Sequence, residues 1–131
     1  MTETISELAN SRFIISSNVT VDFRTEKIGL IKGSLIFING SELFFKEYLD
    51  LRYKIEKLSY SFHYQDKDCL MIFRYDNAAH KPSLGFKEHK HVFDKIFQSE
   101  IPNLKEIMEE IINDHLTILG IQNLVLISHF Q

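Results

Sequence analysis

The amino-acid sequence predicts an α+β domain, in which an antiparallel β-sheet meander of about five strands is covered on one face by a C-terminal amphipathic helix. Three observations support this class: apolar and polar residues alternate through much of 13–75, an Asn-Gly pair separates two alternating runs, and region 104–115 has helical spacing. The chain has 131 residues, 44% of them hydrophobic, with no repeat or linker. We therefore expect a single domain over residues 1–131.

Period-two alternation predicts the first strand and a hairpin after it. Apolar residues recur on odd positions from Phe13 to Phe23. The runs 31–37 and 43–49 alternate in the same way on either side of Asn39-Gly40, a pair that tolerates the positive φ of a hairpin turn. A two-residue loop pairs Ile38 with Ser41, Ile36 with Leu43 and Lys32 with Glu47.

A second hairpin is predicted between residues 58 and 75, with its turn at 65–68. Tyr60, Phe62 and Tyr64 share one face of its first strand, and His63 lies on the other. The predicted register pairs Tyr64 with Cys69, Phe62 with Met71, Tyr60 with Phe73, His63 with Leu70 and Ser59 with Arg74. The aromatic face is expected in the core, with His63 and Arg74 together on the opposite, more polar face.

Two helices are predicted outside the sheet. Leu104, Ile107, Met108, Ile111, Ile112 and His115 follow helical spacing. Asn103 and Glu106 have the spacing of a capping box at its start, and Gly120 is a suitable stop. Thr4 and Glu7 have the same spacing and predict a short N-terminal helix that ends near Asn10. The apolar tail 121–131 is compatible with a last strand, a packed tail or a surface for a partner.

Composition and charge exclude several classes of protein. A single cysteine permits no intrachain disulfide, which favours a reducing, cytoplasmic location over a secreted scaffold. The N-terminus lacks the features of a signal peptide, and no apolar run is long enough to span a membrane, so no membrane association is expected. The net charge of −3 is unlike that of most non-specific nucleic-acid binders, which are basic.

The segment from Arg74 to His91 is the best candidate for a functional site. It contains Arg74, Tyr75, Asp76 and Asn77, followed by His80, His89, Lys90 and His91. Histidine exchanges protons near neutral pH, and arginine binds phosphate and stabilises developing negative charge. In an extended stretch His89 and His91 point the same way, with Lys90 opposite. Ordinary structural roles compete with this interpretation, since Asp-Asn after a strand is typical of a turn and Arg at a strand end is often an ion-pair residue.

Other kinds of chemistry have weaker support in the sequence. His80, His89 and His91 could supply three metal ligands, but their spacing matches no zinc signature. There is no Gly-x-Ser-x-Gly elbow, no glycine-rich phosphate loop and no dinucleotide fingerprint. We therefore expect no cofactor and no metal.

The residues of 30–93 resemble the TumE family of toxins from toxin–antitoxin pairs. The resemblance is carried by motifs in this order: Gly33-Ser34-Leu35-Ile36-Phe37, Asn39-Gly40-Ser41, Tyr60-x-x-His63-Tyr64-Gln65, Phe73-Arg74-Tyr75-Asp76-Asn77-Ala78 and His89-Lys90-His91. The chain departs from the family pattern at Ala79-His80-Lys81-Pro82 and Lys87-Glu88, where family members commonly have further proline and histidine residues. The resemblance implies a cytoplasmic toxin that an antitoxin neutralises and that acts on RNA or translation.

Three hypotheses follow. In the first, the chain is a metal-independent ribonuclease: His80, His89 or His91 transfer protons, and Arg74 and Lys90 stabilise the charge on the reacting phosphate. Substrate would be bound by Tyr60, His63, Tyr75, Asn77 and Lys90. In the second, it is a non-catalytic module that binds an antitoxin or forms a homodimer through its acidic helix and apolar tail. In the third, it is a metal-dependent hydrolase that uses His80, His89 and His91.

Overall fold

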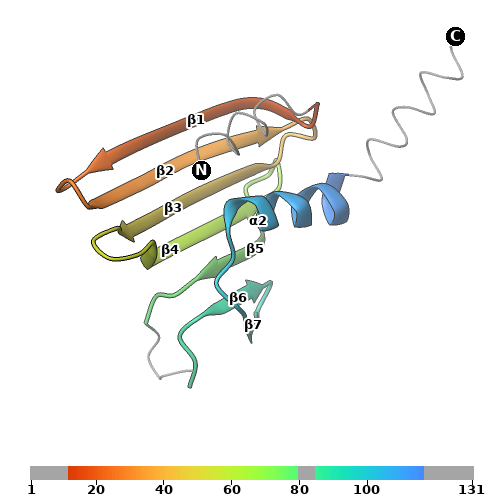
Figure 1. The fold of residues 1–131 in the computed structure, drawn as a ribbon. Coiled ribbons are helices and arrows are strands. Elements are labelled where there is room, and N and C mark those ends of the chain that lie inside the picture. The colour runs from red at the N-terminus through yellow and green to blue at the C-terminus, as the bar shows by residue number, and fades with distance from the viewer. Residues whose placement is uncertain (1–11, 80–84, 117–131) are drawn as a thin grey trace, which may run out of the picture.

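The computed structural model describes residues 12–79 and 85–116 of the chain (Figure 1). One antiparallel sheet of seven strands runs through this part, and each strand pairs with its neighbours in sequence order. The strands are β1 (Ile14–Phe23), β2 (Ile28–Phe37), β3 (Glu42–Asp50), β4 (Glu56–Gln65), β5 (Met71–Asp76), β6 (His89–Val92) and β7 (Lys95–Gln98). An α-helix, α2 (Leu104–Ile111), and a π-helical turn, η1 (Ile112–Leu116), follow.

The first hairpin forms at the predicted place with a register one residue away from the predicted one. Gly40 has a φ of +82°, and the amide of Phe37 donates to the carbonyl of Ser41 at 2.9 Å. The loop thus has three residues with glycine in the left-handed position, the second common way to close a hairpin. Ile36 consequently faces Glu42, and Lys32 faces Lys46, so the predicted pairing of Lys32 with Glu47 is wrong.

The second hairpin forms, but its strand register differs from the predicted register by four residues. A bulge between Tyr64 and Gln65 and a tight turn at Asp66–Leu70 delay the return strand, which begins at Met71. The Asp66 side chain accepts hydrogen bonds from the amides of Asp68 and Leu70, which stabilises this turn. His63 therefore faces Arg74 instead of Leu70. The predicted face assignment is still confirmed, because Tyr60, Phe62 and Tyr64 are buried and His63 lies beside Arg74.

The sheet has seven strands, whereas the sequence predicted about five, because β6 and β7 were not recognised. Each has four residues, and the turn between them has Phe93 at a φ of +55° where glycine or asparagine is usual. Alternation within β6 is confirmed: His89 and His91 share one face, since they pair with Asp76 and Arg74, and Lys90 pairs with Tyr75 on the other. The described chain is consequently mostly β, with a smaller helical part than an α+β domain suggests.

The two faces of the sheet differ in composition. The helix face contains the buried cluster, in which strand residues such as Leu35, Phe62 and Phe73 pack with α2 residues such as Ile107 and Met108. The open face contains the residues between them in sequence. They are mostly polar or charged, and they include Arg74, Asp76, His89 and His91. Strand alternation alone separates these two sets.

Helix α2 begins at the predicted capping box: the side chain of Asn103 accepts from the amide of Glu106, whose carboxylate accepts from the amide of Asn103. Its apolar side belongs to the buried cluster, and Figure 1 shows it in front of the β4–β5 part of the sheet. Eight residues extend only about 12 Å, much less than the width of the sheet. Val21 and Phe23 on β1 are more than half exposed. The prediction that the helix covers one whole face of the sheet is therefore not shown by the residues that pack with α2.

Some predictions concern residues outside the described part of the chain. These are the N-terminal helix at Thr4–Asn10, the helix stop at Gly120, the tail 121–131 and the candidate His80. Among the described residues, none of the helical segments has the length and hydrophobicity of a membrane span.

Candidate functional site

Three predicted site residues form a row across neighbouring strands of the open face. His63 on β4 lies directly opposite Arg74 on β5, and Arg74 lies directly opposite His91 on β6. Directly opposite residues in antiparallel strands have Cα atoms about 5 Å apart. The Cα atoms of His63 and His91 are therefore about 10 Å apart, with Arg74 between them. The meander topology therefore brings together three residues that are far apart in sequence.

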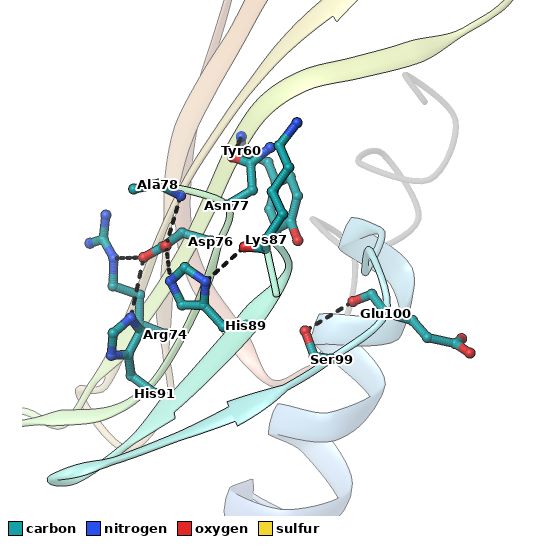
Figure 2. A network of polar contacts seen from close by, with 10 residues as sticks. All are labelled: Tyr60, Arg74, Asp76, Asn77, Ala78, Lys87, His89, His91, Ser99 and Glu100. Atoms are coloured by element: carbon teal, nitrogen blue, oxygen red, sulfur yellow. Dashed lines mark hydrogen bonds and ion pairs between the residues drawn. The ribbon is translucent and has the colours of Figure 1, made fainter. Parts of the chain in front are cut away.

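Asp76 connects this row to a buried neighbour (Figure 2). Its Oδ2 accepts from Nε of Arg74 at 2.7 Å and lies 3.7 Å from Nε2 of His91. Its Oδ1 lies 2.6 Å from Nε2 of His89 and accepts from the amide of Ala78 at 3.1 Å. The contact with Ala78 is the turn role that the sequence suggested for an aspartate at this place. The same carboxylate also organises three cationic or titratable side chains.

The partners of His89 identify its charge. Nδ1 contacts the carbonyl oxygen of Lys87 at 2.8 Å, and Nε2 contacts the carboxylate of Asp76. Both partners are acceptors, and a ring that donates to both of them carries hydrogen on both nitrogens, which is the imidazolium form. Burial raises the pKa of the Asp76 carboxyl, but hydrogen bonds from Arg74 and Ala78 and the charge of His89 outweigh it and lower the pKa below its ordinary 3.8. Asp76 and His89 thus form a buried ion pair beside the row, on the same face of the sheet.

Burial also separates the residues that a ligand can reach from those that it cannot. The side chain of His89 is fully buried, whereas those of Arg74 and His91 are 39% and 19% exposed. The rings of His89 and His91 meet edge to face with centroids 4.9 Å apart. His89 therefore supports the ring of His91 and the carboxylate that orients Arg74. In this network of Arg74, Asp76, His89 and His91, the groups that reach solvent are those of Arg74 and His91.

The other predicted substrate-binding residues lie away from this row. Tyr60, Tyr75 and Lys90 belong to the helix face. The Lys90 ammonium donates to Glu110 of α2 at 2.9 Å and lies over the ring of Tyr75. Burial and the hydrogen bond with Glu110 raise the pKa of the Tyr75 hydroxyl.

Asn77, by contrast, connects the ends of two strands. Its side-chain oxygen accepts from the amide of Tyr60 at 3.1 Å, and its amide donates to the carbonyl of Leu58 at 3.3 Å. It therefore has a clear structural role.

Sequence reasoning considered Asp76 only as a turn residue and did not include it among the site residues. Two signals could have identified it. It follows Arg74 by two positions, so strand alternation places both on one face. Recognition of a strand at 89–92 would then have placed His89 and His91 beside it.

Asp76, His89 and His91 also satisfy the geometric requirement for a metal-binding group. Their ligand atoms lie within 4.8 Å of one another. Two imidazoles and a carboxylate suit zinc, iron or manganese, and a carbonyl acceptor on the second ring nitrogen commonly orients a metal-binding histidine. Arg74, His89 and Ala78 already occupy the carboxylate, however. A metal ion would have to displace the guanidinium, so these residues fit the ion-pair network better.

Comparisons with known proteins agree with the resemblance found in the sequence. The family model described as toxin TumE matches residues 4–119. Searches of curated proteins and of solved structures found no match. The matched range contains the whole described part of the chain, including every residue of the row.

Proposed function

We propose that this chain, which belongs to the TumE toxin family, cleaves RNA without a metal ion. As a member of that family it is a toxin component of a toxin–antitoxin system, with an antitoxin as its partner. One observation supports the proposal above the others. An arginine and a histidine lie side by side on an open polar face, both partly exposed and with nitrogens 2.7 Å and 3.7 Å from one buried carboxylate, which accepts a hydrogen bond from the arginine.

The proposed reaction uses the 2′-hydroxyl of RNA as an internal nucleophile, which needs only positioning and proton transfer. His91 takes the proton of the 2′-hydroxyl as its oxygen forms a bond to phosphorus. The bond from phosphorus to the 5′-oxygen breaks, and the departing oxygen receives a proton. The products are a 2′,3′-cyclic phosphate and a 5′-hydroxyl, so atoms and charge balance without another reactant.

Arg74 and His63 complete the reaction in this proposal. The Arg74 guanidinium lies between the two imidazoles and stabilises the additional negative charge on the phosphate oxygens. His63 protonates the departing 5′-oxygen. Its Nε2 contacts Gln65 Oε1 at 3.1 Å, and that contact is exchanged for the substrate oxygen. Asp76 and His89 are positioning residues, because they act through Arg74 and His91.

Induced expression in bacteria tests the proposal at the level of the cell. Arg74→Ala and His91→Ala should each abolish growth arrest while circular dichroism and the melting transition of the purified variants show a folded protein. Arg24→Ala is the matched control, because Arg24 lies in the turn after β1 and forms an exposed ion pair with Asp22 at the end of that strand. If both site variants stay as toxic as the wild type, the proposed roles are wrong.

A metal-dependent hydrolase is the second candidate, and the convergence of Asp76, His89 and His91 is the observation in its favour. Elemental analysis of protein purified without a polyhistidine tag distinguishes the two. About one zinc, manganese or iron per chain, lost in His89→Ala, would establish the second candidate. Metal below about one tenth per chain, with activity kept in EDTA, would support the first.

The predicted homodimer, RNA substrate and cytoplasmic location remain predictions. Gel filtration of the purified chain tests the homodimer. An inactive chain that forms a stable complex with its antitoxin but cleaves no RNA would instead support a non-catalytic binding module.

A further inference from the structure

A groove of about 540 Å³ runs along the open face beside the site. It extends from β1 to β5 and ends at His63 and Arg74. Three of the residues that line it are cations, Lys32, Lys46 and Arg74, and none of the described lining residues is acidic. The local charge is therefore positive although the whole chain has a net charge of −3. Such a groove favours an anionic ligand.

The two lysines of the groove repel each other across neighbouring strands. Lys32 and Lys46 are directly opposite on β2 and β3, and like charges in this position destabilise a sheet. A neutral or acidic residue at either position would remove this repulsion. A pair of cations held together against their own repulsion is consistent with a ligand that carries more than one negative charge.

An aromatic ring adds a second kind of contact. Phe44 belongs to the open face, is 41% exposed and lines the groove directly opposite His63. Its ring centroid lies 6.4 Å from that of His63, which it faces across β3 and β4. An exposed aromatic ring close to several cationic side chains is the combination by which proteins bind unpaired bases together with their phosphates.

We infer that this groove binds single-stranded RNA and that it holds the nucleotides on one side of the phosphate to be cleaved. The inference rests on the proposed function and names its substrate class. Phosphates lie along Lys32 and Lys46, one unpaired base stacks on Phe44, and the reacting phosphate reaches Arg74. Duplex RNA is excluded as a good substrate, because its bases are not available for stacking.

The position of the site within the sheet makes this binding one-sided. From β1 to β5 the groove side extends across four strand spacings, about 19 Å. Beyond His91 on β6 the described sheet has one more strand, β7, with four residues. Additional nucleotides on the groove side should therefore raise kcat/KM strongly, and additional nucleotides on the other side should have little effect.

Binding is measured by fluorescence anisotropy with labelled 2′-O-methyl oligonucleotides, which cannot form the cyclic phosphate. The wild type should bind a single strand at least about tenfold more tightly than the same sequence as a duplex. Phe44→Ala should weaken binding about 5- to 150-fold. Lys46→Glu should weaken it and reduce the slope of log K against log salt by about 0.7. Phe97→Ala and Lys105→Glu are matched controls on the helix face, where Phe97 is 49% exposed.

The one-sided requirement is measured by cleavage. Once a cleavage position is mapped, substrates are extended separately on its 5′ and 3′ sides. Equal effects on the two sides, equal binding of single strand and duplex, or unchanged binding in both Phe44→Ala and Lys46→Glu would each overturn the inference. If the Phe44→Ala and Lys46→Glu variants still bind and cleave RNA as the wild type does, the groove is not the binding site, but the proposed cleavage stands. If RNA binds on the groove side and is not cleaved, the proposed reaction is wrong, but the binding site stands.

Discussion

The two faces of the sheet use the same strands for opposite purposes. On the helix face, Phe62 and Tyr64 are fully buried and pack with α2. On the open face, the residues next to them in sequence, Ser61 and His63, line a groove. The helix face thus supplies the hydrophobic stabilisation of the domain. The open face contains an opposed pair of lysines, which lowers stability, and a buried charge pair, which is costly to break.

In this meander the polar open face, and not the buried face, contains the candidates for function. A polar network that stabilises a fold need not present cations to solvent, whereas Arg74 and His91 are held by buried partners and remain accessible. Substitutions on the two faces should therefore separate loss of stability from loss of RNA binding.

Replacing the carboxylate at the centre of the open-face network should destabilise the protein as much as removing a core ring. Asp76→Asn leaves the His89 imidazolium buried without its counter-ion, and removal of one partner from a buried pair costs about 3–5 kcal/mol. Chemical denaturation measures this loss. Asp22→Asn, which breaks an exposed ion pair, is the control and should change the free energy of unfolding by less than about 0.5 kcal/mol. Equal effects of the two variants would show that the network contributes little.

A pair of phenylalanine variants compares the faces directly. Phe62→Ala removes a fully buried ring and should lower the free energy of unfolding by about 3–5 kcal/mol. Phe44→Ala removes a ring that is 41% exposed, so it should cost much less stability and mainly weaken RNA binding. Thermal denaturation and binding are measured on both. A larger stability loss at Phe44 than at Phe62 would reverse the assignment of the faces.

Gly33→Ala tests how closely β1 and β2 pack. A Cβ at this position would lie 2.4 Å from the carbonyl oxygen of Asn18 and 2.9 Å from Cζ of Phe45. The backbone of β1 and a core ring must both move, which typically costs about 1–3 kcal/mol. The melting temperature should fall accordingly, and an unchanged value would mean that the strands separate without strain.

Acid should weaken the open-face network before it affects the apolar cluster. The folded-state pKa of Asp76 is lowered, so its contribution to stability is complete above its ordinary 3.8 and is lost as pH falls through the lower folded-state value. Denaturation curves between about pH 6 and pH 2 should show a loss of stability that is smaller in Asp76→Asn than in the wild type. The same pH dependence in both proteins would exclude Asp76 as its source.

The smallest expected effect is a gain. Lys46→Gln removes the repulsion with Lys32 and should raise the free energy of unfolding by about 0.2–1 kcal/mol while it weakens RNA binding. Opposite signs for stability and binding are the signature of a residue kept for a ligand. A loss of stability would mean that Lys46 supports the fold.

Most of the fold could be predicted from the sequence because alternation and turn chemistry are local. The strands around Asn39-Gly40, the burial of Tyr60, Phe62 and Tyr64, and the capping box at Asn103 follow from such patterns. The registers could not be predicted, because a glycine at the third loop position and a bulge at Tyr64 each shift the pairing.

Only part of the candidate site could be predicted, because it depends on pairing between distant segments. Arg74 and His91 were identified from residue type, and their contact with Asp76 arises only when β6 pairs with β5. The turn at Phe93 and the short length of β6 concealed that pairing. Tyr75 and Lys90 looked equivalent to Arg74 in sequence, and strand alternation places them on the helix face.

The chemical nature of the RNA ends shows whether the 2′-hydroxyl is the nucleophile. Purified protein is incubated in EDTA with a labelled single-stranded RNA, and the ends of the fragments are identified by mass spectrometry. The account predicts 2′,3′-cyclic phosphate and 5′-hydroxyl ends, lost in His91→Gln and retained in Arg24→Ala. Fragments with 3′-hydroxyl and 5′-phosphate ends, or equal cleavage by His91→Gln, would contradict it.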